Sequence, residues 1–195
     1  EEMRELCSFA RANDLYVHVD GARFGNAVAS LGCRPAELTV AAGVDIMSFG
    51  ATKNGAMAAE AVVVFNPELV ETLGFRRKRA AHLFSKMRFL SAQLEAYLTD
   101  GLWLKLAGQA NAMAERLADG LTDVDGVEIV CPVEANMIFA RFPVSLVEHL
   151  HDAGFWFHHW GDAELPTVRL VTAFNTDPDD VDRFIDAAHA HAAEV

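Results

Sequence analysis

The sequence has few cysteines and lacks any long apolar run. Its three cysteines, Cys7, Cys33 and Cys131, form neither an even set nor a CxxC pair, which indicates free thiols in a reducing compartment. No stretch approaches the ~20 apolar residues needed to cross a bilayer, and the first residues do not resemble a signal peptide. We therefore expect a soluble, cytoplasmic protein with no membrane partner.

Basic residues are also scarce. Lysine and arginine number 16 against 28 acidic residues, so the formal net charge is −12. This charge repels phosphate backbones and argues against a nucleic-acid partner. The one basic run, residues 76–79, predicts a solvated helix face or a surface that pairs with acidic groups of a sister subunit.

The composition is otherwise that of a globular protein. With 195 residues, 52% of them hydrophobic, the chain can bury a core of one or two domains. It begins at Glu1 inside an amphipathic helical pattern and without an initiating methionine. We interpret it as the later part of a longer protein.

The first part of the chain alternates between helical and strand patterns. Helices are predicted at residues 2–13 and 35–42, and strands at 15–19, 44–49 and 58–65. Such alternation is typical of an α/β fold with a mainly parallel sheet.

From Pro67 the pattern becomes helical, and after Gly126 it becomes mixed. Helices are expected at 68–73, 76–98 and 103–120, followed by strands at 127–131, 137–142, 155–158 and 168–172 and helices at 144–153 and 178–193. We therefore predict two domains: residues 1–92, the C-terminal part of a large ligand-binding domain, and residues 93–195, a linking helix and a small α+β domain.

The most informative stretch runs from Val17 to Lys53. At each end an apolar run stops at a charged residue close to a glycine, so one strand presents Asp20 and the next presents Lys53. Taken singly, these features are usually an ordinary turn and a solvated lysine. Together they lie about one βαβ repeat apart, which places both loops on the edge of the sheet where α/β proteins bind ligands.

An acid and an amine at one sheet edge suit pyridoxal phosphate. That cofactor needs a lysine amine for its imine and an ionised acid beside the pyridine nitrogen. An arginine fork then holds the substrate carboxylate by two charge-assisted hydrogen bonds. The candidates are Lys53, which lies in a loop of small residues, Asp20, and Arg169 on a late strand.

Four segments carry a specific resemblance. Residues 18–23 (HVDGAR), 26–27 (NA), 44–55 (VDIMSFGATKNG) and 168–172 (VRLVT) resemble the low-specificity L-threonine aldolases. These are pyridoxal phosphate enzymes of the aspartate-aminotransferase type, fold type I, in the β-eliminating lyase-like family. The resemblance implies that Lys53 is the imine lysine, Asp20 the partner of the pyridine nitrogen, and Arg169 the carboxylate clamp. It also implies that Arg23 contacts the cofactor or the carboxylate.

The family's activity is retro-aldol cleavage of β-hydroxy-α-amino acids such as threonine and allo-threonine to glycine and an aldehyde. The resemblance further implies a homo-oligomer, commonly a tetramer, with an amino acid as its small-molecule substrate. Another pyridoxal phosphate-dependent β-eliminating lyase or an aminotransferase would need the same residues. A non-catalytic fragment or assembly module remains the alternative of a different class.

The sequence departs from the family in two respects. The phosphate loop, the ring that stacks on the cofactor and the histidines near the substrate hydroxyl have no counterpart after Glu1. Residues 84–88 (FSKMR) stand where many relatives carry a glycine-rich run. The resemblance still implies that Arg88 can contact a cofactor phosphate, including one across a subunit interface.

Other polar and aromatic residues have simpler interpretations. His158 and His159 are neighbours on a predicted strand, so their side chains should point to opposite faces rather than bind one metal ion. Trp103 and Trp156 are expected to be packing residues.

Overall fold

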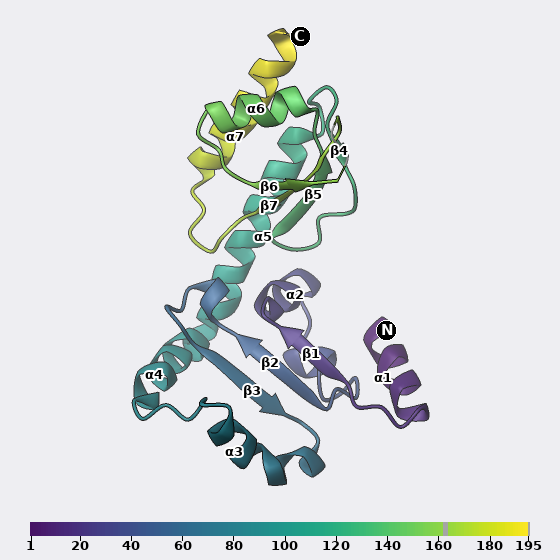
Figure 1. The fold of residues 1–195 in the computed structure, drawn as a ribbon, viewed down its shortest axis with the longest axis vertical. Helices are drawn as coiled ribbons and strands as arrows, with labels where there is room; N and C mark the ends of the chain where they lie inside the picture. The colour runs from purple at the N-terminus through teal and green to yellow at the C-terminus, as the bar shows by residue number, and fades with distance from the viewer. Residues whose placement is uncertain (162–163, 195) are drawn as a thin grey trace. The chain divides into compact units, whose positions relative to one another are not determined.

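A computed structural model describes residues 1–161 and 164–194. Within it the chain forms two compact units, Glu1–Lys105 and Leu106–Val195. Figure 1 shows the helices and strands of each unit. Across these described residues, every helix is too short or too polar to span a membrane. The functional domain boundary after residue 92 stays a prediction, because compactness alone does not say where a ligand-binding domain ends.

The first unit alternates helices and strands in the order the sequence predicts. Its elements are α1 Glu2–Ala12, β1 His18–Gly21, α2 Phe24–Leu31, η1 Pro35–Leu38, β2 Ile46–Gly50, η2 Thr52–Asn54, β3 Glu60–Val64, η3 Pro67–Leu69, α3 Val70–Arg79, α4 Met87–Leu98 and η4 Thr99–Gly101. The η elements are short 3-10 helices. The 20-residue helix α5, Leu102–Leu121, begins in this unit and continues into the second.

The three strands form a sheet in the order β1-β2-β3. β1 pairs with β2 in parallel, as predicted, with Asp20 opposite Ser48. β3 runs antiparallel to β2, which the prediction of a mainly parallel sheet did not include. The connection over residues 51–59 explains the difference, because a parallel crossover needs a dozen or more residues.

One face of this sheet is covered by helices. Met47 and Phe49 of β2 pack with Phe24 of α2, with Tyr97 near the end of α4 and with Trp103 near the start of α5. Trp103 is therefore a packing residue, as expected. The side chains on the other face are exposed or only partly buried, and His18 and Asp20 of β1 are among the exposed ones. Since residues alternate along a strand, Asp20 stands on the open face of the sheet.

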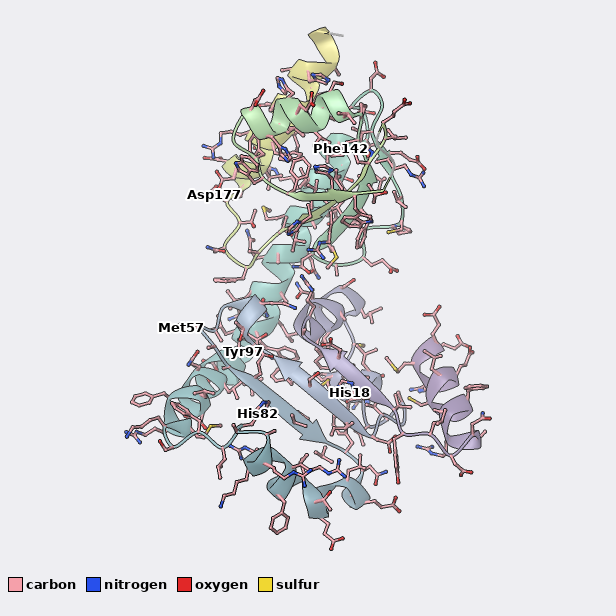
Figure 2. All side chains as sticks on the ribbon, viewed as in Figure 1. His18, Met57, His82, Tyr97, Phe142 and Asp177 are labelled. Atoms are coloured by element: carbon pink, nitrogen blue, oxygen red, sulfur yellow. The ribbon has the colours of Figure 1, made fainter. Side chains whose placement is uncertain are left out.

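Several predicted elements of the first unit were wrong in their boundaries. The helix expected at 35–42 is only the short η1, and the helix expected at 68–73 is divided between η3 and α3. The strand expected at 15–19 starts only at His18, because the Leu15 backbone N–H donates to the Ala10 carbonyl and closes α1. The long helix expected at 76–98 is two helices separated by residues 80–86, with Ala81 at a positive φ of 60°. His82, labelled in Figure 2, lies in this break and donates its backbone N–H to Arg77.

The second unit is a sheet with helices on one face. Its strands are β4 Glu128–Ile129, β5 Met137–Arg141, β6 His158–Trp160 and β7 Thr167–Val171, and its further helices are α6 Val144–Asp152 and α7 Pro178–Glu194. The strands pair antiparallel in the order β4-β5-β7-β6. β6 starts three residues later than the strand predicted at 155–158, because the Phe155 N–H closes α6 onto Leu150.

The core of the second unit lies between the sheet and helices α5, α6 and α7. Ile138, Ala140, Val168 and Leu170 point from β5 and β7 into this core, where Phe142, labelled in Figure 2, is fully buried. Trp156 is 81% exposed, so its predicted packing role was wrong. The alternate residues of β5 and β7, among them Phe139 and Arg169, stand on the opposite face.

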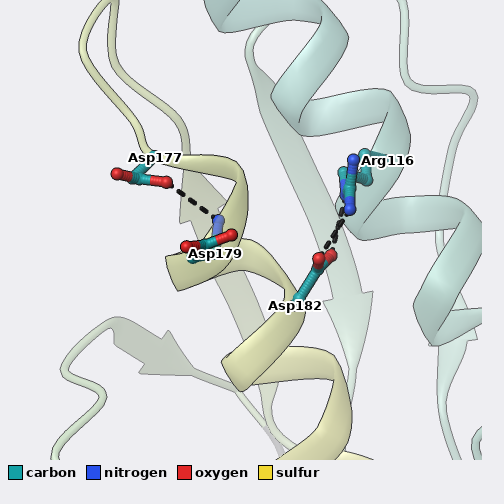
Figure 3. A network of polar contacts seen from close by, with 4 residues as sticks. All are labelled: Arg116, Asp177, Asp179 and Asp182. Carbon is teal, nitrogen blue, oxygen red and sulfur yellow. Dashed lines mark hydrogen bonds and ion pairs between the residues drawn. The ribbon is translucent and has the colours of Figure 1, made fainter.

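An ion pair links two helices of the second unit (Figure 3). Arg116 of α5 donates to both carboxylate oxygens of Asp182 on α7, at 2.8 and 2.6 Å. At the start of α7, the Asp177 carboxylate accepts the backbone N–H of Asp179 at 3.0 Å and so caps the helix. The hydrogen bonds from Arg116 lower the pKa of Asp182, although both side chains are partly exposed.

We expect Asp182→Asn to lower stability at neutral pH but not in acid. Because the folded-state pKa of Asp182 lies below its unfolded value, the ion pair stabilises the fold above the unfolded pKa and ceases to do so as the pH falls through the folded one. Urea unfolding at pH 7 and pH 3 measures the difference between variant and wild type. Asp186→Asn on the same helix is the matched control. An equal loss at both pH values would contradict this account.

Candidate functional site

The parallel pairing of β1 and β2 brings two candidate residues to one edge of the first sheet. Asp20 lies near the carboxyl end of β1, opposite Ser48, and Lys53 lies in η2 directly after the carboxyl end of β2. Parallel neighbours end at the same edge, where open α/β sheets bind ligands. The predicted juxtaposition of these two strand ends is therefore present in the structure.

Asp20 presents its carboxylate on the open face of the sheet. Its Oδ1 accepts the backbone N–H of Ala22 at 3.0 Å, which fixes the carboxylate at the turn after β1. On the same face, His18 Nε2 lies 3.3 Å from Ser48 Oγ, so the two strands also share a side-chain hydrogen bond. The Asp20 carboxylate has no cationic partner among the described residues, so it is available to a positively charged group of a ligand.

The turn after β1 lies unusually close to the end of β2. A Cβ added at Gly50 would lie 2.9 Å from the Ala22 Cα and 3.2 Å from its carbonyl oxygen. Glycine at this position therefore allows the backbone that follows Asp20 to touch the strand that leads to Lys53. Close backbone approach is therefore the structural reason for the glycine at position 50.

Lys53 sits in a short turn whose other residues are tied down. The Lys53 side chain is exposed, whereas Asn54 is only 4% exposed. Asn54 Nδ2 donates to Tyr97 Oη at 2.7 Å and to the Trp103 carbonyl at 2.8 Å. Gly55 ends the turn with a φ of 114°, a conformation that favours glycine.

Asn54 is the positioning residue that sequence reasoning missed. It holds the lysine turn on two buried groups that come from α4 and the start of α5, and Tyr97 is labelled in Figure 2. Burial raises the pKa of Tyr97 despite the hydrogen bond from Asn54, so the phenol stays neutral and accepts this bond at physiological pH. An asparagine directly after the candidate lysine was visible in the sequence, but its buried partners lie more than 40 residues away.

Arg23 stands at the N-terminal end of α2 in the same unit. It is half-buried, and its Nε is buried with no hydrogen-bond partner among the described residues. Its carbonyl accepts the backbone N–H of Asn26 at 3.0 Å, which starts the helix and fixes the arginine backbone. A dehydrated guanidinium N–H without a partner is costly, so this side chain suits an anionic ligand.

Arg88 lies elsewhere in the first unit. It is exposed in the first turn of α4, with its guanidinium carbon 4.8 Å from the centre of the Phe89 ring. Among the described residues, no hydrogen bond or ion pair joins it to Asp20 or Lys53. The contact that the structure gives the Arg88 guanidinium is the one with Phe89.

Arg169 belongs to the second unit. It lies in the middle of β7, with Phe139 of β5 opposite it on one side and His158 of β6 on the other. The side chain is half-buried, and its Nε, like that of Arg23, is buried without a hydrogen-bond partner in the described part of the chain. The position fits an anion-binding group on the open face of the second sheet.

Comparison with known proteins places the chain in a family. Residues 1–143 match the family model described as "Beta-eliminating lyase". The chain is 44% identical over 158 residues to a low-specificity L-threonine aldolase from a Pseudomonas species and, to the same degree, to one from Pseudomonas aeruginosa. Both matches cover 81% of this chain and 46% of the relative, so the chain spans about half the length of these curated relatives.

The fold is shared with a solved structure of similar description. A threonine aldolase from Leishmania major superposes with a TM-score of 0.91 at 25% identity, over 98% of this chain and 56% of the other. The match therefore extends through both units of the chain.

We expect Asn54→Ala to destabilise the first unit by about 1–3 kcal/mol, because the Tyr97 hydroxyl and the Trp103 carbonyl would lose a buried donor. Asn13→Ala is the matched control, since Asn13 makes one exposed hydrogen bond to Phe9. Thermal and urea unfolding of the two variants measure the difference. Equal stability of the two would show that Asn54 does not anchor the lysine turn.

Proposed function

Because the chain belongs to the beta-eliminating lyase family, we propose that its protein is a pyridoxal phosphate-dependent aldolase. It would cleave L-threonine, L-allo-threonine and related β-hydroxy-α-amino acids between Cα and Cβ to give glycine and an aldehyde. The observation that carries the proposal is the parallel pairing of β1 and β2, which presents Asp20 and Lys53 at one sheet edge. The low-specificity L-threonine aldolases among the relatives support the choice of reaction.

The residues present fit pyridoxal phosphate, the cofactor on which the family depends. The site offers an exposed amine, a carboxylate with no cationic partner among the described residues, and a half-buried arginine with an unpartnered Nε. These match the aldehyde, the pyridine nitrogen and an anionic group respectively. Lys53 would hold the cofactor through its amine, Asp20 would keep the ring nitrogen protonated, and Arg23 would contact cofactor or substrate.

Each candidate site residue then has a defined role. Arg169 would hold the substrate α-carboxylate by a two-pronged hydrogen bond, and Arg23 would bind the cofactor or a substrate carboxylate. Asn54 keeps the Lys53 turn in place through Tyr97 and Trp103, so that the amine is positioned before substrate arrives. The cofactor, when bound, supplies an electron sink for the pair released as the Cα–Cβ bond breaks.

We also propose a wider setting for the chain. The sheet β1-β2-β3 would be the C-terminal part of a larger, mainly parallel sheet that belongs to the cofactor domain, with residues 93–195 as the linking helix and small domain. The protein would work in the cytoplasm. The phosphate loop and the group that deprotonates the substrate hydroxyl would be supplied by residues outside this sequence.

Lys53→Ala tests the function in the protein as it occurs in its organism. The wild type should release glycine and acetaldehyde from L-threonine, and the absorbance of the lysine-bound cofactor should disappear in the variant together with at least a thousandfold loss of kcat, because the covalent attachment is gone. Lys105→Ala, which removes an exposed lysine of α5, is the control and should keep both.

The products discriminate between this activity and its alternatives. Pyruvate with ammonia would indicate a β-eliminating lyase, and a keto acid formed with an amino acceptor would indicate an aminotransferase. A wild-type protein that shows no absorbance of bound cofactor would overturn the proposal and leave an assembly module without catalysis.

We further propose a homo-oligomer, a tetramer, assembled through the region around α3. No residue of α3 is buried, Phe75 is 80% exposed, and the last turn carries the basic run 76–79. A second copy, with a formal charge of −12, offers the complementary surface. In such an assembly Arg88 could reach the cofactor phosphate of a neighbouring subunit.

Reversing two charges tests the assembly. Arg76→Glu together with Arg77→Glu should shift the protein to a smaller species in sedimentation equilibrium, because like charges would then face each other. Lys105→Glu, a charge reversal at an exposed lysine of α5, is the control. A wild-type protein that sediments as a monomer, or a double variant that sediments like the wild type, would refute the proposal.

A further inference from the structure

We propose that His158 is a second hydrogen-bond donor to the substrate carboxylate at Arg169, so that the two side chains form one carboxylate site on the second sheet. The inference rests on the proposed role of Arg169 as the carboxylate clamp. It assigns a substrate-contacting role to a residue that the sequence indicated only as one of two strand neighbours that should not bind one metal ion.

The strand register places His158 beside Arg169. Phe139 of β5, Arg169 of β7 and His158 of β6 are direct partners in one row across three antiparallel strands. Side chains that are opposite each other in such a pair point to the same face, with Cβ atoms about 4.5–5.5 Å apart. An anion bound by the Arg169 guanidinium is therefore within reach of the His158 ring.

The row lies on the open face of the sheet. Val168 and Leu170, which flank Arg169 along β7, point into the core, so Arg169 points away from it. Phe139 covers one side of Arg169, and its ring meets the Trp160 ring edge-on at 6.3 Å. The Phe139 side chain is apolar and cannot donate a hydrogen bond. His158 is therefore the polar neighbour of Arg169 in this row.

The charges on this face single out Arg169. Arg141, two positions along β5 from Phe139, forms an ion pair with Glu128 of β4 at 2.8 Å. Arg169 has no ion pair among the described residues, and its buried Nε lacks a hydrogen-bond partner. An anion would therefore bind at Arg169 rather than at Arg141, and the adjacent imidazole N–H would supply a further donor.

His159 provides an internal comparison. It pairs with Val168, which is fully buried, and its ring lies 5.9 Å from His151 of α6. Neighbouring residues on a strand point to opposite faces, so His159 stands on the helix side of β6 while His158 stands on the Arg169 side. The two histidines share residue type, strand and exposure, and they differ in the face that they occupy.

The test compares His158→Ala with His159→Ala in the complete, cofactor-loaded protein. In His158→Ala we expect KM for L-threonine and the dissociation constant of glycine, measured by calorimetry, to rise about tenfold, the effect of losing one hydrogen bond to a charged group. The kcat should stay within about twofold of wild type, because this contact is the same in the bound substrate and in the transition state. His158→Gln, which keeps a donor, should recover part of the affinity, and His159→Ala should match the wild type.

A ligand without the carboxylate separates a direct contact from a structural effect. Glycinamide keeps the amine and replaces the charged carboxylate by a neutral amide, which accepts a weaker hydrogen bond, so its dissociation constant should rise less in His158→Ala than that of glycine. An equal loss of affinity for glycine and glycinamide, or a His158→Ala variant that behaves like His159→Ala, would overturn the inference.

Arg169→Ala, measured in parallel, separates this inference from the proposed function. If it raises KM while His158→Ala does not, the clamp stands and the role of His158 is refuted. If Arg169→Ala leaves KM for L-threonine unchanged, the clamp itself is refuted, and the carboxylate site proposed for His158 falls with it.

Discussion

The first unit depends on the close parallel pairing of β1 and β2 at their carboxyl ends. Gly50 has no side chain, and this lets the backbone at Ala22 approach within a distance that a Cβ would block. Asp20 precedes that contact and Lys53 follows it, so a single backbone approach fixes the spacing of an acid and an amine. The hydrogen bonds of Asn54 to Tyr97 and Trp103 then hold the lysine turn against the helices. Asn54 therefore connects the candidate site to the packed core of the first unit.

The sequence predicted those parts of the fold that depend on local pattern. Hydrophobic periodicity located α1, β2, β5, β7 and α7 to within two residues, and the charged residues at two strand ends located Asp20 and Lys53. It failed where the backbone N–H of an expected strand residue closes the preceding helix, and where a break between helices contains no glycine or proline. Leu15 and Phe155 continue apolar runs, yet each donates its N–H to the end of a helix, so β1 and β6 start later. Ala81 breaks the helix expected at 76–98 without any residue that signals it.

The candidate site could be predicted as a set of residue types but not as a set of contacts. Asp20, Lys53, Arg23 and Arg169 belong to recognisable motifs, whereas the anchoring of Asn54 depends on a tyrosine and a carbonyl far along the chain. The sequence also could not predict which residues lie beside Arg169. β5, β7 and β6 pair out of chain order, and a register across three strands is set by the whole sheet rather than by any local pattern. Arg88 shows the reverse case, a residue chosen by resemblance that the single chain leaves on its surface.

In both sheets, the residues that stabilise the fold and the candidate binding residues lie on opposite faces. In each unit one face carries the apolar side chains that pack under helices, and the alternate residues of the same strands carry Asp20 in the first unit and Arg169 in the second. Apolar burial supplies most of the stability of such a unit, so the open face is free to hold charges that contribute little to it. The unpartnered Nε atoms of Arg23 and Arg169 go further, because a dehydrated donor costs stability until an anion binds. Their presence in both units fits the proposal that each arginine binds an anion.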